Sequence, residues 1–251
     1  MTIPLPQELP RNLRLIAFSP DGKTLYLQIN DPLGPGDAIR KIEFKPTRQT
    51  LVRGSEGFGT IWRLTVSPTS GKLFVSGCSK KRGTLECGAF EIDPDAGTSR
   101  ALHVGTDGGG TLGPVSPDGK RVLCHQGNQL NLLDLGTGIA HPLRADLKWE
   151  SWSPDGRWIA AISDTGRIVL IDATDTSRRR SLGSSGHGPV CWSPDSKFLL
   201  RVKSQLRCTL TLYFESLNLF NVESGRRRVI KSSRCEIIGG QVGWVDPESV
   251  R

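Results

Sequence analysis

Short apolar stretches followed by a fixed turn recur along this chain of 251 residues. Stretches such as LIAF (15–18) and PVCW (189–192) end at a Ser-Pro pair, and the residues after the turn alternate between apolar and polar types, as in TLYLQI (24–29). Alternation with a period of two predicts a strand whose two faces differ. Ser-Pro-Asp-Gly fits a type I turn, because proline fixes φ at the second position and glycine suits the fourth. The pattern therefore predicts a β-hairpin.

A second hairpin follows each of the first ones. In RIVLIDATDTSRRRSL (167–182) and LNLFNVESGRRRVI (217–230), an apolar strand, a polar turn and an arginine-rich strand come in that order. The repeating unit is thus a meander of four strands, with the strand before Ser-Pro on the inside and the arginine-rich strand on the outside. Such a meander cannot bury both of its faces alone, so neighbouring units must stack.

The turn prolines set the period of the repeat. Pro20, Pro68, Pro117, Pro154 and Pro194 lie 48, 49, 37 and 40 residues apart, which suits one four-stranded propeller blade per repeat. We expect an all-β propeller domain over 12–251, after an N-terminal extension at 1–11 that offers at most one outer closing strand. VGWVDPES (242–249) predicts the inner strand of an incomplete sixth repeat at 237–251. The five complete repeats are expected near 12–60, 61–108, 109–146, 147–185 and 186–236.

These repeats resemble the TolB-like, WD-like β-propeller repeat. The likeness rests on the SPDG hairpins and on third strands that end in EID (91–93), LLD (132–134) and LID (170–172), and it extends over about residues 12–246. It implies a β-propeller fold, and a fold does not by itself imply a function. True WD repeats are the neighbouring possibility, because Gly186-His187 precedes one inner strand, but the third strands lack the Trp-Asp pair.

Little in the sequence indicates catalytic chemistry. None of the four histidines stands at metal-ligand spacing to another, and the Gly-x-Ser-x-Gly motif of a hydrolase is missing. The run DPDAG (93–97) lacks the further acids of a calcium loop and takes the place of a hairpin turn. We therefore expect no catalytic residue, no metal site and no cofactor.

The chain is basic, with a formal net charge of +8. The charge peaks at the arginine runs 178–180 and 226–228, and such a patch is able to bind nucleic acid or another anionic surface. We favour exposed outer strands protected by arginine, because the aromatic residues of a single-strand binder are missing there. No apolar stretch is long enough to span a bilayer, and the start of the chain has no signal-peptide pattern.

Two pairs of cysteines are predicted to form disulfides. Cys78 and Cys87 flank the middle turn of the second repeat, and Cys208 and Cys235 fall on one face of the fifth. Disulfides indicate an oxidising compartment, and four reduced thiols in a cytosolic protein are the alternative. The localisation stays open: extracytoplasmic (periplasmic) if the chain is a fragment, cytoplasmic if Met1 is the native start.

The expected function is binding rather than catalysis. We expect a non-enzymatic binding or scaffold domain for a protein or small ligand, since similar propellers form C-terminal sensory parts of larger bacterial proteins. Phe58, Trp149 and His187 are the expected contact residues, with core packing as the alternative for Trp149. The other function considered is a propeller enzyme of the lactonase or lyase type, or a regulatory propeller of an enzyme. The contact face is expected at the blade-to-blade loops 54–60, 105–111, 145–150 and 184–189.

Overall fold

The computed structural model describes residues 15–30, 36–81, 84–102, 110–184, 190–206 and 212–236. Within these ranges the chain forms twenty strands and no helix, so the predicted all-β class is confirmed. The chain divides into two compact units, residues 1–142 and 143–251. The predicted N-terminal extension (1–11) and the predicted sixth inner strand (237–251) lie outside the described residues.

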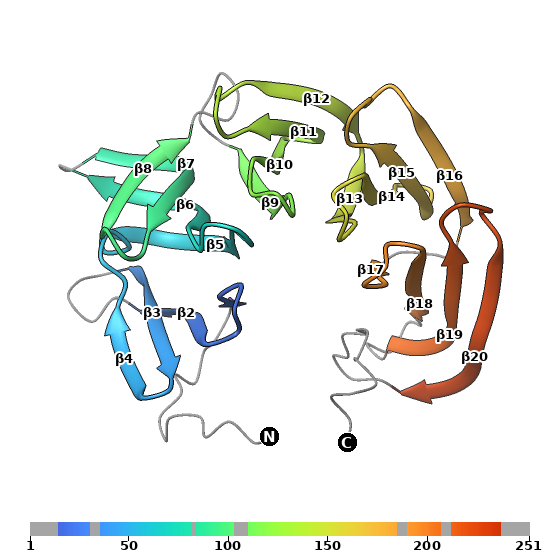
Figure 1. Ribbon diagram of the computed structural model, residues 1–251, viewed down its shortest axis with the longest axis horizontal. Coiled ribbons are helices and arrows are strands. Elements are labelled where there is room, and N and C mark those ends of the chain that lie inside the picture. The colour runs from blue at the N-terminus through green and yellow to red at the C-terminus, as the bar shows by residue number, and fades with distance from the viewer. Residues whose placement is uncertain are drawn as a thin grey trace. The chain divides into compact units, whose positions relative to one another are not determined.

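Unit 1 contains three consecutive antiparallel meanders of four strands, which we call blades one to three (Figure 1). Within each blade, each strand pairs with the next strand in the chain, and one further residue pair, Asp37 with Phe58, links the sheets of blades one and two. The strands are β1 (Ile16–Phe18), β2 (Thr24–Asn30), β3 (Asp37–Phe44) and β4 (Thr47–Leu51), then β5 (Phe58–Val66), β6 (Leu73–Lys81), β7 (Thr84–Asp93) and β8 (Thr98–Leu102), then β9 (Thr111–Val115), β10 (Arg121–Gln126), β11 (Gln129–Asp134) and β12 (Ala140–Ala145), whose last residues open unit 2.

Unit 2 contains two more meanders of the same kind, blades four and five. The outer strand of each blade is the last one in the chain, as the arginine-rich segments predict. The strands are β13 (Leu147–Trp152), β14 (Trp158–Ser163), β15 (Arg167–Asp172) and β16 (Arg179–Ser184), then β17 (Val190–Trp192), β18 (Phe198–Leu206), β19 (Leu212–Asn221) and β20 (Arg227–Glu236).

A Ser-Pro turn closes the first hairpin of every blade. In blade four the Gly156 N–H donates to the Ser153 carbonyl at 2.9 Å, and the Ser153 N–H donates to the Trp158 carbonyl at 2.8 Å. Gly156 has a φ of 72°, which explains the glycine at this place. The first strands end at Phe18, Val66, Val115, Trp152 and Trp192, each two residues before a turn proline, as predicted.

The blades bury their apolar faces against their neighbours within each unit. Ile39 of blade one and Phe90 of blade two belong to one core cluster. In unit 2, Leu170 of blade four and Trp192 of blade five share another. Stacked four-stranded sheets of this kind are the blades of a β-propeller, so the predicted fold is confirmed.

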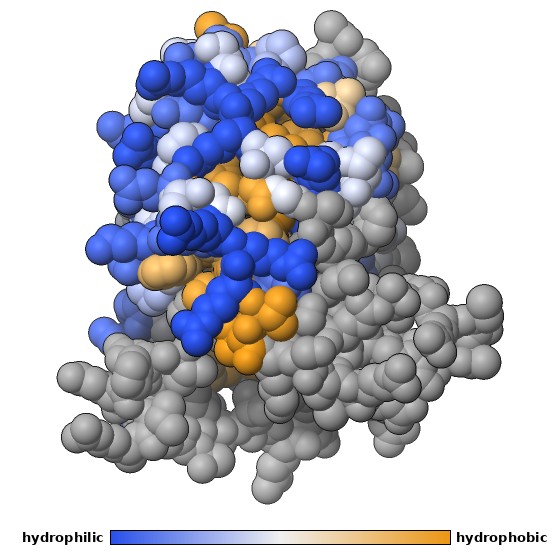
Figure 2. Space-filling model, turned by 90° about the vertical axis from the view of Figure 1, so that its right-hand side faces the viewer, coloured by the Kyte–Doolittle hydropathy of each residue, from blue (hydrophilic) through white to orange (hydrophobic). Residues whose placement is uncertain are grey.

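The outer strands of unit 2 carry mostly hydrophilic residues, with Val229 and Ile230 of β20 as exposed apolar exceptions. Figure 2 views the side on which β16 and β20 lie in Figure 1, and blue, hydrophilic residues dominate its coloured surface. The arginine run 226–228 is exposed, whereas Arg180 of the run 178–180 is half-buried. The arginine-rich segments therefore form exposed outer strands, as expected from their composition.

Candidate functional site

Trp149 is the predicted contact residue that the structure leaves exposed. It lies in β13, the first strand of blade four, and 52% of its surface is accessible, whereas Leu147, Glu150 and Trp152 around it are buried. Lys148 pairs with Ile162 and Ser151 with Ala160, so two residues of β13 face a single residue of β14. This β-bulge changes the direction of the Trp149 side chain.

The backbone of Trp149 is left-handed, with a φ of 58°. A bulky residue with positive φ is a conformational outlier, and such strain persists only where the surrounding structure holds it. Asp146, the single residue between β12 and β13, has a φ of 60°. The segment that carries Trp149 is therefore irregular backbone between regular strands. The alternative of core packing for Trp149 does not hold.

Phe58 is not exposed, and its predicted role as a surface contact is wrong. Its side chain is 2% accessible and packs edge-to-face on Phe90, with ring centroids 5.1 Å apart. The cause lies in the strand boundary, because β5 begins at Phe58 and not at the Trp62 of the predicted inner strand. Gly57, with a φ of 83°, lets the chain turn directly into the strand.

The predicted loops are also shorter than expected. Residues 58–60 belong to β5, and the segment 145–150 is strand except for Asp146. Residues 105–109 and 185–189, and with them His187, lie outside the described residues. Of the three predicted contact residues, Trp149 alone is both described and exposed.

Cys78 and Cys87 form a disulfide, as the sequence predicts. They lie directly opposite each other in the β6–β7 pair. Cys208 and the side chain of Cys235 lie outside the described part of the structure. Cys124 is buried as a free thiol, and burial raises its pKa to about 12, which makes it a structural residue rather than a nucleophile.

Aspartate side chains accept hydrogen bonds in two kinds of turn, the Ser-Pro turns and the turns between third and fourth strands. In the Ser-Pro-Asp turns the serine hydroxyl donates to the aspartate at 2.6 Å in blades one and five, and the N–H two residues later donates at 3.1 Å. The serine hydrogen bond and then the backbone hydrogen bond lower the pKa of Asp21 and of Asp195. In the turns between third and fourth strands, backbone N–H groups similarly lower the pKa of Asp93 and Asp134.

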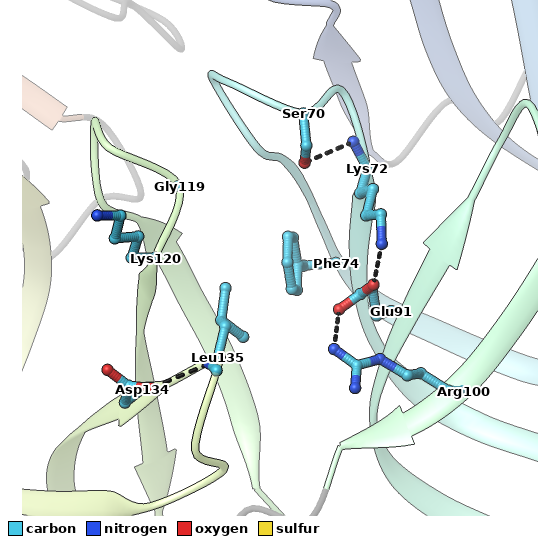
Figure 3. Close-up of a pocket in the computed structure, with 10 residues that line it drawn as sticks. Ser70, Lys72, Phe74, Glu91, Arg100, Gly119, Lys120, Asp134 and Leu135 are labelled. Carbon is cyan, nitrogen blue, oxygen red and sulfur yellow. Dashed lines mark hydrogen bonds and ion pairs between the residues drawn. The ribbon is translucent and has the colours of Figure 1, made fainter.

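A pocket of about 350 Å³ lies between blades two and three of unit 1 (Figure 3). Lys72, Glu91 and Arg100 of blade two form one wall, and Lys120 and the turn 134–136 of blade three form the other. The Phe74 ring lies between the two walls. Its lining includes Ser70 and Gly119, which belong to the Ser-Pro turns of the two blades.

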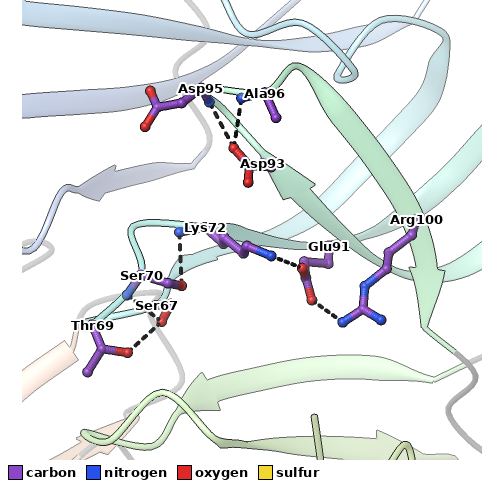
Figure 4. Close-up of polar contacts among 9 residues, drawn as sticks. All are labelled: Ser67, Thr69, Ser70, Lys72, Glu91, Asp93, Asp95, Ala96 and Arg100. Carbon is purple, nitrogen blue, oxygen red and sulfur yellow. Dashed lines mark hydrogen bonds and ion pairs between the residues drawn. The ribbon is translucent and has the colours of Figure 1, made fainter. Parts of the chain in front are cut away.

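Glu91 connects the two cations of its wall (Figure 4). Lys72 Nζ donates to Glu91 Oε1 at 2.7 Å, and Arg100 Nη2 donates to Oε2 at 2.6 Å. Burial by itself would raise the pKa of Glu91, but these two hydrogen bonds lower the pKa overall. Glu91 is therefore ionised, and it fixes the positions of two cations whose side chains remain 38% and 60% exposed.

Sequence reasoning missed this pocket, although one signal for it exists. Glu91 is an acid within an apolar third strand, GAFEID, where blade four has Leu170 and blade three has Leu132 at the matching place. Within the described ranges, no three His, Cys, Asp or Glu side chains are grouped as metal ligands would be. Nor does the described part of the chain hold a helical segment that would serve as a membrane span.

Comparison with known proteins identifies the fold. No protein-family model and no curated protein matches the sequence. The structure of putative TolB from Agrobacterium tumefaciens is similar to this one, with a TM-score of 0.65 and 17% identity over 91% of this chain and 83% of that chain. Oligogalacturonate lyase in complex with manganese is similar with a TM-score of 0.64 and 16% identity over 87% of this chain and 65% of that one.

TolB from Acinetobacter baumannii is a further structural relative, with a TM-score of 0.58 and 17% identity over 89% of this chain. This chain spans about half of that protein, 55% of its length. Identities this low show a shared fold and nothing about activity. The four-stranded blades, the Ser-Pro turns and these similarities together show that the chain has the TolB-like β-propeller fold.

Proposed function

We propose that this chain is a non-enzymatic binding or scaffold domain that contacts a protein or small ligand through aromatic residues of its first strands. One observation carries the proposal: Trp149 is half exposed on a first strand, with a left-handed backbone and a β-bulge beside it. Strain of this kind costs about 1–3 kcal/mol and clusters at ligand-binding sites. A large exposed aromatic side chain is also the residue type that dominates binding interfaces.

First strands of unit 1 carry further exposed apolar side chains. Ile16 and Phe18 of β1 are each 55% accessible, and Trp62 of β5 is 48% accessible. In a β-propeller the first strand of each blade is the innermost one. Exposed apolar residues on these strands support a contact surface on the first strands of each unit by itself.

The state of five acidic side chains argues against a general-acid role for any of them. A general acid that works at neutral pH needs a raised pKa. The hydrogen bonds of the turns lower the pKa of Asp21, Asp93, Asp134 and Asp195, and the paired cations lower that of Glu91. These acids stabilise turns and an ion-pair network in their ionised forms.

We also propose an oxidising, extracytoplasmic location for the domain, as part of a larger bacterial protein. The Cys78–Cys87 disulfide supports the compartment, because cytosolic proteins rarely keep such bonds. The resemblance to TolB-like repeats supports the larger protein.

Site-specific photocrosslinking in the native host tests the binding function. With benzoyl-phenylalanine at position 149, we expect one discrete crosslinked adduct that disappears when excess unlabelled protein competes for the partner. The same group at Arg179, an exposed residue of the outer strand β16, is the matched control and should give none. Equal crosslinking at both positions, or none at 149, would contradict the proposal.

A propeller lyase is the second candidate function, because the structure is similar to oligogalacturonate lyase in complex with manganese. Incubation with oligogalacturonate and Mn²⁺ tests it. Unsaturated products, followed by their ultraviolet absorbance, would establish the enzymatic alternative and overturn the non-enzymatic proposal. We expect no product above the level of a heat-denatured sample.

A further inference from the structure

The interface between blades two and three differs from the interface between blades four and five at one arginine. Arg100 pairs with Glu91 in the β7–β8 register, and Arg180 pairs with Leu170 at the same place in β15–β16. The two arginines therefore occupy equivalent positions on the outer strands of their blades. Their partners differ because blade two has an acid where blade four has a leucine.

Arg180 crosses to the next blade. It donates to the carbonyls of Val222 and Glu223 in the β19–β20 turn, and its guanidinium lies over the Trp158 ring, 4.9 Å from the ring centroid. This contact bridges blades four and five. An arginine in this position thus joins two blades when nothing on its own blade competes for it.

Arg100 does not make the equivalent contact, because its guanidinium donates to Glu91. The turn that it would reach is Leu135–Gly136 in blade three. Leu135 matches Val222, since the Leu135 N–H donates to the Lys120 carbonyl at 2.9 Å and the Val222 N–H donates to the Lys197 carbonyl at 2.8 Å. The pocket lies where the arginine contact is missing.

The walls of this pocket carry a net positive charge. Lys72, Arg100 and Lys120 supply three positive charges, against two negative ones from Glu91 and Asp134. Glu91 uses one N–H of Lys72 and one of Arg100, and the remaining donors of both exposed side chains stay available. Lys120 is exposed, and none of the ion pairs within the described ranges involves it.

We propose that this pocket binds a small organic monoanion, a carboxylate on an apolar body. The carboxylate accepts hydrogen bonds from Lys72 and Arg100, and the apolar body lies against Phe74 and Leu135. The Lys120 ammonium points away from these two cations (Figure 3). A volume of about 350 Å³ is at the lower end of the range of about 300–1,000 Å³ for ligand pockets, so the ligand is small. One negative charge matches the local excess of one positive charge. This site is independent of the proposed function of Trp149.

Titration with 3-phenylpropionate, followed by ¹H–¹⁵N NMR of the full chain, tests the proposal. We expect a Kd on the order of 1 mM, as is typical for a ligand of this size. The amide signals that shift should be those of 70–74, 119–120 and 134–136, which line the pocket. The neutral amide 3-phenylpropionamide should bind at least about tenfold more weakly, because it lacks the charge.

Matched variants separate the pocket from general attraction to a basic protein. Arg100→Gln should weaken binding about five- to tenfold, since it removes one charged donor. Arg179→Gln is the control, because Arg179 is an exposed arginine of the outer strand β16 and does not line the pocket. It should leave the Kd unchanged, as should Trp149→Gly. Equal binding of acid and amide, equal effects of the two arginine variants, or shifts outside the pocket would overturn the proposal.

Discussion

Trp149 adopts a backbone conformation that its surroundings impose. Its φ is 58°, and the buried residues on either side of it, together with the bulge against β14, fix the strand there. A left-handed conformation costs an L-residue about 1–2 kcal/mol, and glycine avoids this cost. The sequence predicts Trp149 as a contact residue, but its strain depends on the register of two strands, which the sequence pattern does not reveal.

The left-handed backbone at position 149 predicts which of two substitutions there gives the more stable protein. In an ordinary strand, glycine is less stable than alanine by about 0.5–1 kcal/mol. At position 149 the order should be reversed, so Trp149→Gly should be about 1 kcal/mol more stable than Trp149→Ala. Urea unfolding of both variants measures the difference. A Trp149→Ala variant that is the more stable of the two would show that the backbone there is not left-handed in solution.

The ion pairs of Glu91 predict that the stability of the fold depends on pH. Its pKa is lowered in the folded state below the usual 4.5, so its ionised form stabilises the fold above pH 4.5. This contribution declines as the pH falls below that value and through the folded pKa. The parent should therefore exceed Glu91→Gln in stability at neutral pH, and the difference should shrink towards pH 3.

Urea midpoints at neutral and acidic pH check this dependence. Glu86→Gln is the control, because Glu86 lies on the same strand, β7, and is exposed. Its difference from the parent measures the loss of a carboxylate that lacks the Lys72 and Arg100 contacts. A constant difference between the parent and Glu91→Gln would mean that the Lys72 and Arg100 contacts do not hold the carboxylate ionised.

At the scale of elements, strands were predictable where an apolar stretch meets a Ser-Pro turn. Proline and glycine fix the turn locally, so the ends of the first strands follow from the sequence alone. Phe58 shows where this reasoning fails: glycines at 57 and 59 obscure the start of β5, and burial against Phe90 decides it. The pocket was not predictable for a similar reason, because Glu91 and Arg100 come to lie opposite the turn 134–136 only through strand register and blade packing.

The β6–β7 hairpin is held by its disulfide as well as by its ladder. Cys78 and Cys87 are 9 residues apart, and by chain entropy a bridge of that span contributes about 2–3 kcal/mol. Adding reductant should lower the free energy of unfolding of the parent by this amount. The double variant Cys78→Ser/Cys87→Ser should start at the lower stability and not respond to reductant. Equal stability of oxidised parent and double variant would contradict the estimate.

At the scale of the whole molecule, the repeats were predictable because their period is visible in the turn prolines. The period does not show which side chains form the interface between each pair of blades. Within unit 2, Trp192 of blade five joins the core of blade four, and its Nε1–H donates to the Ser151 carbonyl at 3.3 Å. In unit 1, Val115 takes the place of Trp192 and is buried with Phe74 of blade two, and the charged pocket lies where the equivalent of the Arg180 contact is missing. The same repeat therefore makes an arginine-bridged interface in one place and a ligand-sized pocket in another.

Trp192 should therefore stabilise blades four and five together. Its side chain is 7% accessible, so Trp192→Ala should lower the free energy of unfolding by about 3–5 kcal/mol, as other large-to-small core changes do. Trp192→Phe keeps an aromatic ring in the cluster, so it should cost less than Trp192→Ala. About 1 kcal/mol of its cost should come from the lost hydrogen bond to the Ser151 carbonyl. Trp62→Ala, at an exposed first-strand tryptophan, is the control and should cost less than about 1 kcal/mol.

Urea unfolding followed by far-ultraviolet circular dichroism gives all three values. If Trp192→Ala unfolded at the same urea concentration as Trp62→Ala, Trp192 would not be packed between the blades, because only a buried side chain leaves a cavity when it is removed.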